Sequence, residues 1–249
     1  NGPIQEVIIY DADKSTDRAS IEENIGDYFT QNTPLLDTYT GAAACYSLRL
    51  MRTAYTGALI RVRRSSDNAE LDINANVFGE LDTVSLLAFA GAGDAFVKTW
   101  YDQSGNSNDA TQTTTASQPQ IVSSGAVIVE NGKPALQFDG SNDTLESASN
   151  VVSNSAMSLF MPYKFDNTAS RPQDVIMSST TDGFKYGMSG AGQDQYAKYS
   201  PLETTTWANT TTNQVLDSLF SLASGGAILY TDGVLQTATG TAGIVGTNT

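Results

Sequence analysis

The residues best suited to chemistry are gathered in one polar loop. Its side chains combine two aromatic rings with four amide or carboxylate groups, at Trp100, Tyr101, Asp102, Asn106, Asn108 and Asp109. Amides and carboxylates bond to hydroxyl groups, and an aromatic face covers the apolar side of a sugar ring. The combination predicts a carbohydrate-binding site at these six residues. The alternative is a loop that hydrogen-bonds to itself and simply ends a strand.

A second group of carboxylates imitates a calcium-binding loop. Asp11, Asp13, Asp17 and Glu22 have the ligand spacing of an EF-hand, but the sixth position is Thr16, where that loop requires glycine. Carboxylates at the positive end of a helix explain the same residues. A complete loop of this kind would bind calcium. Because the loop is incomplete, we expect no bound cofactor and no metal site.

Several catalytic classes are excluded by composition. The chain has no histidine, which removes Ser-His-Asp catalysis and histidine-ligated zinc. Its single cysteine, Cys45, cannot form an internal disulfide and is expected to be a small buried residue. Glycoside hydrolysis needs two carboxyl groups roughly 5 to 9.5 Å apart. The sequence offers many acidic residues but selects no pair.

The charge and hydropathy of the chain exclude two classes of partner, nucleic acid and the membrane interior. The 249 residues include 13 Lys and Arg against 27 Asp and Glu, a net charge of −14, which repels nucleic acid. No stretch reaches the roughly 18 apolar residues of a membrane span, so no membrane insertion is expected. Five arginines are expected to pair with carboxylates, the alternative being a site for phosphate or sialic acid: Arg49, Arg52, Arg61, Arg63 and Arg64.

The elements that must position these residues are mostly strands. Asn131-Gly132 and Asp232-Gly233 each predict a β-hairpin, because both dipeptides accept the positive φ of a tight turn. Strands are expected at 4–10, 59–63, 96–101, 158–165, 174–178, 184–188 and 216–223, and helices at 21–29, 42–51 and 83–90. So many strands separated by turns predict a two-sheet β-sandwich.

Particular stretches resemble known families. Residues 138–143 and 229–234 resemble the strand and hairpin motifs of concanavalin A-like (laminin G-like) jelly-roll domains. Residues 48–145, above all 99–112, resemble modules of bacteriophage virion and tail proteins and are similar to the first half of the catalytic domain of family 54 arabinofuranosidases. The resemblance implies an all-β, concanavalin A-like two-sheet jelly-roll sandwich with a few short helices. That family's catalytic carboxylates and paired cysteines find no counterpart in the matching stretch.

The order of the elements departs from the jelly-roll pattern. Such domains end on a closing strand, whereas here the matching strand comes first and the chain stops where it should begin. We therefore expect residues 1–33 to supply the closing strand and its helix, in their own chain or in a neighbour's, and residues 34–249 to form the sandwich body. The assembly strand would use Ile4, Val7, Ile8, Ile9 and Tyr10.

These expectations favour a structural role. They predict a non-enzymatic module, on a virion surface or extracellular, that assembles into a fibre, tail or capsid-surface element with glycan-binding adhesion as an added role. Its partners would be further copies of itself, other virion proteins and a cell-surface glycan. The alternative is a carbohydrate-binding lectin module for receptor recognition, and the third hypothesis is a glycoside hydrolase of the arabinofuranosidase type.

Overall fold

In the part of the chain that it describes, the computed structural model is all-β with few helices. It describes residues 15–16, 33–149, 151, 157–164 and 227–242, together with the backbone of five strands between 173 and 221. Every pair of neighbouring strands in this part is antiparallel. The prediction of an all-β architecture with a few short helices is confirmed for these residues. The predicted strand at 4–10 and helix at 21–29 lie outside the described residues.

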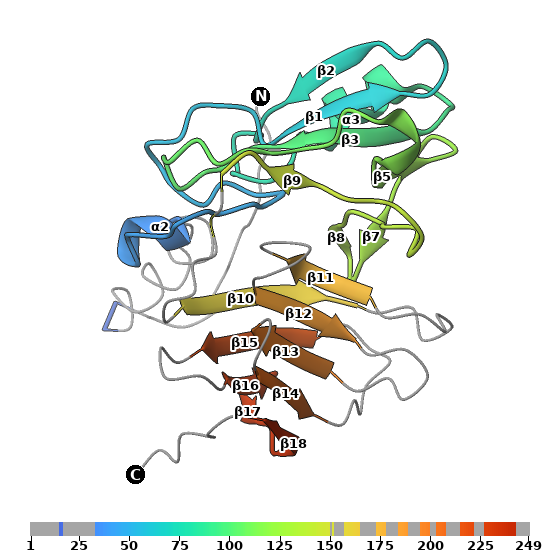
Figure 1. Cartoon of the computed structure of the whole chain (residues 1–249). Helices are drawn as coiled ribbons and strands as arrows, with labels where there is room; N and C mark the ends of the chain where they lie inside the picture. The colour runs from blue at the N-terminus through green and yellow to red at the C-terminus, as the bar shows by residue number, and fades with distance from the viewer. Residues whose placement is uncertain are drawn as a thin grey trace.

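The first sheet holds the candidate site. Its strands run in the order β2-β1-β3-β4-β9, with β5 paired to β3 and β6 paired to β5 (the upper part of Figure 1). Their bounds are β1 Ile60–Arg64, β2 Glu70–Ile73, β3 Ala95–Trp100, β4 Ala110–Thr111, β5 Gln120–Ser123, β6 Ala126–Val127 and β9 Glu146–Ser147. The strands predicted at 59–63 and 96–101 are thus confirmed as β1 and β3, with their ends displaced by one residue.

Alternation along the strands builds the core. In β3, Ala95, Val97 and Thr99 are buried while the residues between them are partly exposed. Helix α3 (Thr83–Ala90), predicted at the same residues, adds its buried face to this cluster. The fully or nearly fully buried apolar side chains of the cluster are Leu59, Ile60, Val62, Ile73, Leu81, Leu86, Ala90, Ala95, Val97, Ile121 and Val122.

Three further sheets lie below the first sheet in Figure 1. The two-stranded sheet of β7 (Val129–Glu130) and β8 (Lys133–Pro134) lies between the first sheet and the other two. The four-stranded sheet consists of β10 Met157–Tyr163, β15 Val215–Ser221, β16 Ala227–Thr231 and β17 Val234–Leu235. The five-stranded sheet consists of β11 Gln173–Met177, β12 Phe184–Met188, β13 Gln195–Tyr199, β14 Glu203–Trp207 and β18 Ala238–Ala242. The strands predicted at 158–165, 174–178, 184–188 and 216–223 are confirmed as β10, β11, β12 and β15.

Both predicted hairpins are present. Asn131 and Gly132 have φ values of 49° and 76° between β7 (Val129–Glu130) and β8 (Lys133–Pro134). Asp232 and Gly233 have φ values of 50° and 77° between β16 and β17. Two consecutive positive φ angles are the requirement of the turn that matches the twist of a hairpin.

One predicted helix is wrong. The segment 42–51 has no helical turn; its only regular feature is a bridge between Arg49 and Glu80. A short helix lies just before it, at α2 (Leu35–Thr38), and a 3-10 turn, η1, spans Thr115–Ser117. Within the described part of the chain, none of the helices combines the length and apolar character that crossing a bilayer requires.

The two sides of α3 give a test of the core. Leu86 is fully buried, whereas Val84 on the same helix is 78% exposed. Leu86→Ala should lower the free energy of unfolding by about 3 kcal/mol, because it removes buried methyl groups and leaves a cavity. Val84→Ala is the matched control and should change it by less than about 0.5 kcal/mol. Urea unfolding of both variants measures the difference, and equal losses would show that α3 does not pack on the sheet as described.

Candidate functional site

A buried carboxylate organises the polar loop at the end of β3. The Asp102 side chain accepts hydrogen bonds from the Cys45 N–H at 2.8 Å, the Ser104 N–H at 2.9 Å, the Ser104 hydroxyl at 2.7 Å and the Asn108 N–H at 3.0 Å. Burial raises the pKa of this carboxyl, but the hydrogen bonds outweigh burial and bring the pKa below its ordinary value. Asp102 is therefore an anion whose acceptor capacity is taken up by its own loop and by the Cys45 N–H.

The next residue fastens the loop to the segment 45–51. Gln103 is completely buried. Its amide nitrogen donates to the carbonyls of Ser47 and Arg49 at 3.1 and 3.0 Å, and its amide oxygen accepts from the Met51 N–H at 2.8 Å. Its backbone N–H donates to the Cys45 carbonyl at 2.9 Å. Because these backbone groups bond across to Gln103, they are not available to the helix predicted over 42–51.

The rest of the loop makes the same kind of bond. The Asn106 side chain donates to the carbonyls of Ala42 and Ala43 at 3.0 and 3.1 Å, and the Asn108 side chain donates to that of Ala43 at 2.9 Å. The Asp109 carboxylate accepts from the Asp102 N–H at 2.9 Å. We call residues 42–52 and 102–109, joined in this way, the clasp.

A glycine makes the clasp possible. Gly105 has a φ of 95°, and a Cβ atom there would lie 2.3 Å from the guanidinium of Arg52, which donates to the Ser104 carbonyl at 2.9 Å. Any larger residue would be strained and would displace this arginine.

The two aromatic residues of the predicted sugar site have different surroundings. Trp100 packs on the core and against the Tyr46 ring, with centroids 5.9 Å apart, and its buried indole N–H finds no acceptor within the described structure. Tyr101 donates its hydroxyl to Asp72 at 2.9 Å, and Asp72 also forms a bidentate ion pair with Arg61. Four of the six predicted residues thus lie in the clasp, with side chains bonded to it. Carbohydrate binding by these six residues stays a prediction.

Among the described residues, two of the five arginines pair with carboxylates as predicted. Arg61 pairs with Asp72, and Arg64 pairs with Asp67. Arg63 differs, because it is buried and donates to three neutral oxygens while its guanidinium lies over a phenylalanine ring. Burial lowers the pKa of Arg63.

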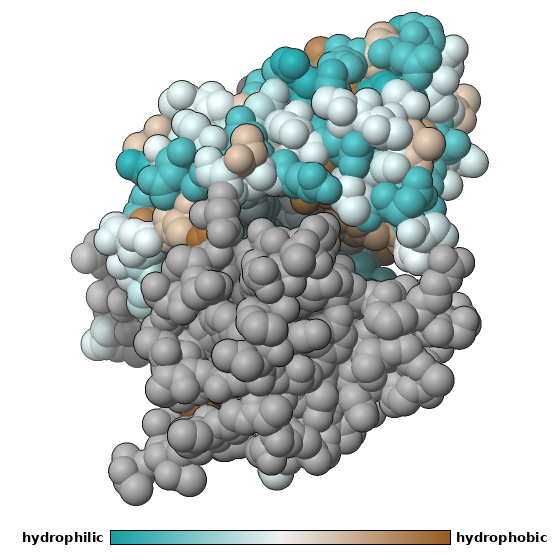
Figure 2. All heavy atoms as spheres, in the orientation of Figure 1, coloured by the Kyte–Doolittle hydropathy of each residue, from teal (hydrophilic) through white to brown (hydrophobic). Residues whose placement is uncertain are grey.

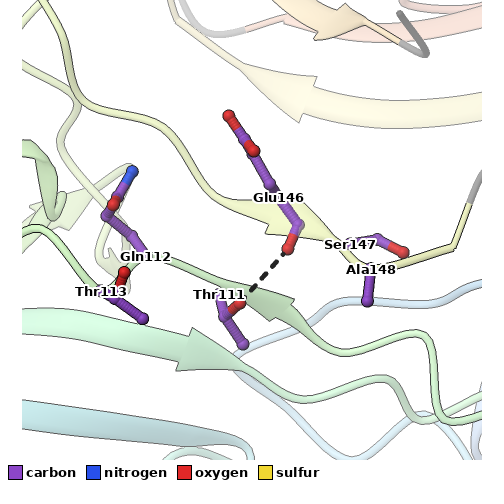
Figure 3. Close-up of a pocket in the computed structure, with 6 residues that line it drawn as sticks. All are labelled: Thr111, Gln112, Thr113, Glu146, Ser147 and Ala148. Carbon is purple, nitrogen blue, oxygen red and sulfur yellow. Dashed lines mark hydrogen bonds between the residues drawn. The ribbon is translucent and has the colours of Figure 1, made fainter.

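A polar hollow lies directly beyond the clasp. Its volume is about 290 Å³, and it is lined by Thr111, Gln112, Thr113, Glu146, Ser147 and Ala148 (Figure 3). The two walls meet because Thr111 and Glu146 are paired in the ladder between β4 and β9. None of these six residues was predicted from the sequence to belong to a site. The two walls of the hollow are separated by more than 30 residues, and no local spacing signals that they meet.

The clasp supports both walls of the hollow. Strand β4 starts immediately after Asp109, which is bonded to Asp102. The hydroxyl of Tyr46 donates to the Asn108 carbonyl and lies beside the Ser147 side chain in the other wall. Burial and then the charge of Asp102 raise the pKa of Tyr46 to about 12, so this hydroxyl remains protonated at neutral pH.

No metal centre is found in the part of the chain that the structure describes. Among those residues, no group of three or more Cys, Asp or Glu side chains is placed to hold an ion. The predicted calcium-like loop at 11–22 lies outside the described residues apart from Ser15 and Thr16. The expectation of no cofactor stays a prediction.

Comparison with known proteins connects this fold to glycoside hydrolases. The family model described as alpha-L-arabinofuranosidase B, catalytic, matches residues 28–198. A GH54 α-L-arabinofuranosidase soaked with a cyclic sulfate inhibitor is 16% identical over 84% of the chain, with a TM-score of 0.61. An arabinofuranosidase complexed with arabinofuranosyl-α-1,2-xylobiose is 18% identical over 80%, with a TM-score of 0.50. The chain spans 52% of the length of each, and no curated protein matches it.

These findings correct the functional expectation. A non-enzymatic structural module of a virion, tail fibre or capsid surface is wrong, because the matching family model is that of a catalytic domain. The lectin alternative was part of the same non-enzymatic prediction and is replaced with it. That expectation rested on the net charge of −14 and on the order of the strands. Figure 2 shows that the described part of this face is indeed mostly hydrophilic or neutral. Surface composition reflects solubility and environment, and it does not determine chemistry.

The Asp102 carboxylate gives a pH-dependent test of the clasp. Its folded-state pKa is lowered, so its contribution to stability is present above the unfolded pKa of about 3.9 and is lost as pH falls through the folded pKa. Asp102→Asn should lower the free energy of unfolding at about pH 6 by about 2 to 3 kcal/mol, since an amide cannot accept from all four donors.

In the same variant, the free energy of unfolding should depend less on pH. Between about pH 6 and about pH 2, wild type should lose more stability than Asp102→Asn, because the variant lacks this titration. Urea unfolding at both pH values measures it. Glu130→Gln, an exposed surface-pair variant, is the control and should follow wild type. Identical pH profiles for wild type and Asp102→Asn would contradict the role given to this carboxylate.

Proposed function

Because the chain belongs to the family of alpha-L-arabinofuranosidase B catalytic domains, we propose that it is a glycoside hydrolase domain that cleaves α-L-arabinofuranosides. The family match over residues 28–198 is the observation that carries this proposal. The two structural neighbours support it through their fold. The substrate class is taken from the name of the family and from the second structural neighbour, which is complexed with an arabinofuranosyl oligosaccharide.

The reaction restricts which carboxylates take part. Hydrolysis of a glycosidic bond uses one carboxyl group as general acid and a second as nucleophile or general base. Asp102 is unsuited to either role, because it is 4% exposed and already accepts four hydrogen bonds. Asp72 is engaged by Arg61 and Tyr101. Glu146 is exposed, and no partner for its carboxylate is found among the described side chains.

Other features belong to the same proposal. We propose that the antiparallel sheets form a concanavalin A-like jelly-roll sandwich, that the domain works outside the cell and that it needs no cofactor. Its partner would be a glycan that carries arabinofuranosyl groups. Self-association through the strand at 4–10 is proposed as well.

Hydrolysis can be measured directly with a chromogenic substrate. Purified chain should release 4-nitrophenol from 4-nitrophenyl α-L-arabinofuranoside and should not release it from 4-nitrophenyl β-D-glucopyranoside. Heat-denatured protein sets the background. Release at the background rate from the arabinofuranoside, by protein with an intact thermal transition, would contradict the proposed activity.

The cofactor proposal has its own test. Dialysis against EDTA should leave both the melting temperature and the rate of 4-nitrophenol release unchanged, because two carboxyl groups and water suffice for the reaction. A fall in the melting temperature that calcium restores would place an ion in the structure.

A further inference from the structure

We infer that the hollow between β4 and β9 binds a neutral sugar unit through its hydroxyl groups, with the Glu146 carboxylate as the main acceptor. The location rests on the geometry of the hollow, whereas the choice of a sugar as ligand rests on the proposed function. In Figure 3 the side chains of Gln112 and Glu146 extend from the two walls toward the same side.

The size of the hollow fits a small ligand. Its volume of about 290 Å³ lies just below the range of roughly 300 to 1,000 Å³ that drug-sized ligand sites occupy. A single sugar ring suits this space. Its lining is polar apart from Ala148, as recognition of hydroxyl groups requires.

Part of the lining is held rigidly by bonds within the protein. The Gln112 side chain donates to the Thr144 hydroxyl at 2.6 Å and accepts from the Thr114 N–H at 2.9 Å. The Ser147 hydroxyl donates to the Ser149 carbonyl at 2.8 Å. These bonds fix the walls before a ligand arrives, which reduces the entropy lost on binding.

Two other groups remain for a ligand. Within the described structure, the Glu146 carboxylate and the Thr113 hydroxyl make no hydrogen bond or ion pair, and both residues are exposed. A carboxylate accepts two hydroxyl donors at once, and hydrogen bonds to a charged group are stronger than those between neutral groups. Adjacent hydroxyls of a sugar ring supply two such donors.

Charge selects against acidic sugars. The hollow holds a carboxylate, and its lining contains neither Lys nor Arg. The whole chain carries a net charge of −14. A uronic acid would bring a second negative charge next to Glu146, which repulsion disfavours. Neutral sugars are therefore the class that fits.

The experiment measures binding separately from hydrolysis. Methyl α-L-arabinofuranoside is titrated into the full chain and followed by saturation-transfer NMR, with D-glucuronic acid as the acidic comparison. Glu146→Gln keeps the shape of the side chain and removes its charge, and it should weaken binding about tenfold, the loss expected for a charged hydrogen-bond acceptor. Thr113→Val should weaken it several-fold. Glu130→Gln is the matched control, because it loses a surface carboxylate outside the hollow.

The outcomes separate this inference from the proposed function. Weaker binding by Glu146→Gln with an unchanged melting temperature and an unchanged control supports the hollow as the sugar site, whether or not the chain hydrolyses the chromogenic substrate. Equal binding by wild type, Glu146→Gln and Thr113→Val overturns it. Tighter binding of D-glucuronic acid than of the arabinofuranoside overturns it as well. Hydrolysis that continues in those cases would leave the proposed function standing without this site.

Discussion

The first sheet depends on two consecutive buried polar side chains at the end of β3. Asp102 and Gln103 together bond seven backbone or hydroxyl groups of the clasp. A buried carboxylate or amide is costly when its bonds are missing, and it fixes one conformation when all of them are made. These bonds hold the irregular segment 42–52 against the sheet without regular secondary structure. They also set the starting point of β4, and with it one wall of the hollow.

The clasp and the hollow differ in whether their polar side chains are already hydrogen-bonded. The polar side chains of the clasp are hydrogen-bonded within the protein. A ligand that used these side chains would have to break the bonds that hold the clasp together. The hollow beside the clasp has the opposite character, because its walls are fixed while Glu146 and Thr113 are uncommitted within the described residues. Tyr46 connects the two regions through Asn108 and Ser147. A binding site needs such a rigid support around the groups that contact the ligand.

Local signals in the sequence were sufficient for much of the fold. Asn131-Gly132 and Asp232-Gly233 specified their turns, because a turn preference acts within a few residues. The helix expected over 42–51 failed for a non-local reason, since its backbone groups bond to Gln103, more than 50 residues away. The pairing of Thr111 with Glu146 is non-local in the same way. The polar loop was recognised, and the structure shows its amides and carboxylates bonded within the clasp.

The most direct test is a crystal structure of the chain soaked with methyl α-L-arabinofuranoside. We expect one sugar ring in the hollow between β4 and β9, with two hydroxyl groups within hydrogen-bond distance of the Glu146 carboxylate and the clasp unchanged. A sugar bound elsewhere, with the hollow empty at a saturating concentration, would contradict the site. A sugar bound to Asp102 or Asn108 after the clasp had opened would contradict the rigid support on which the site depends.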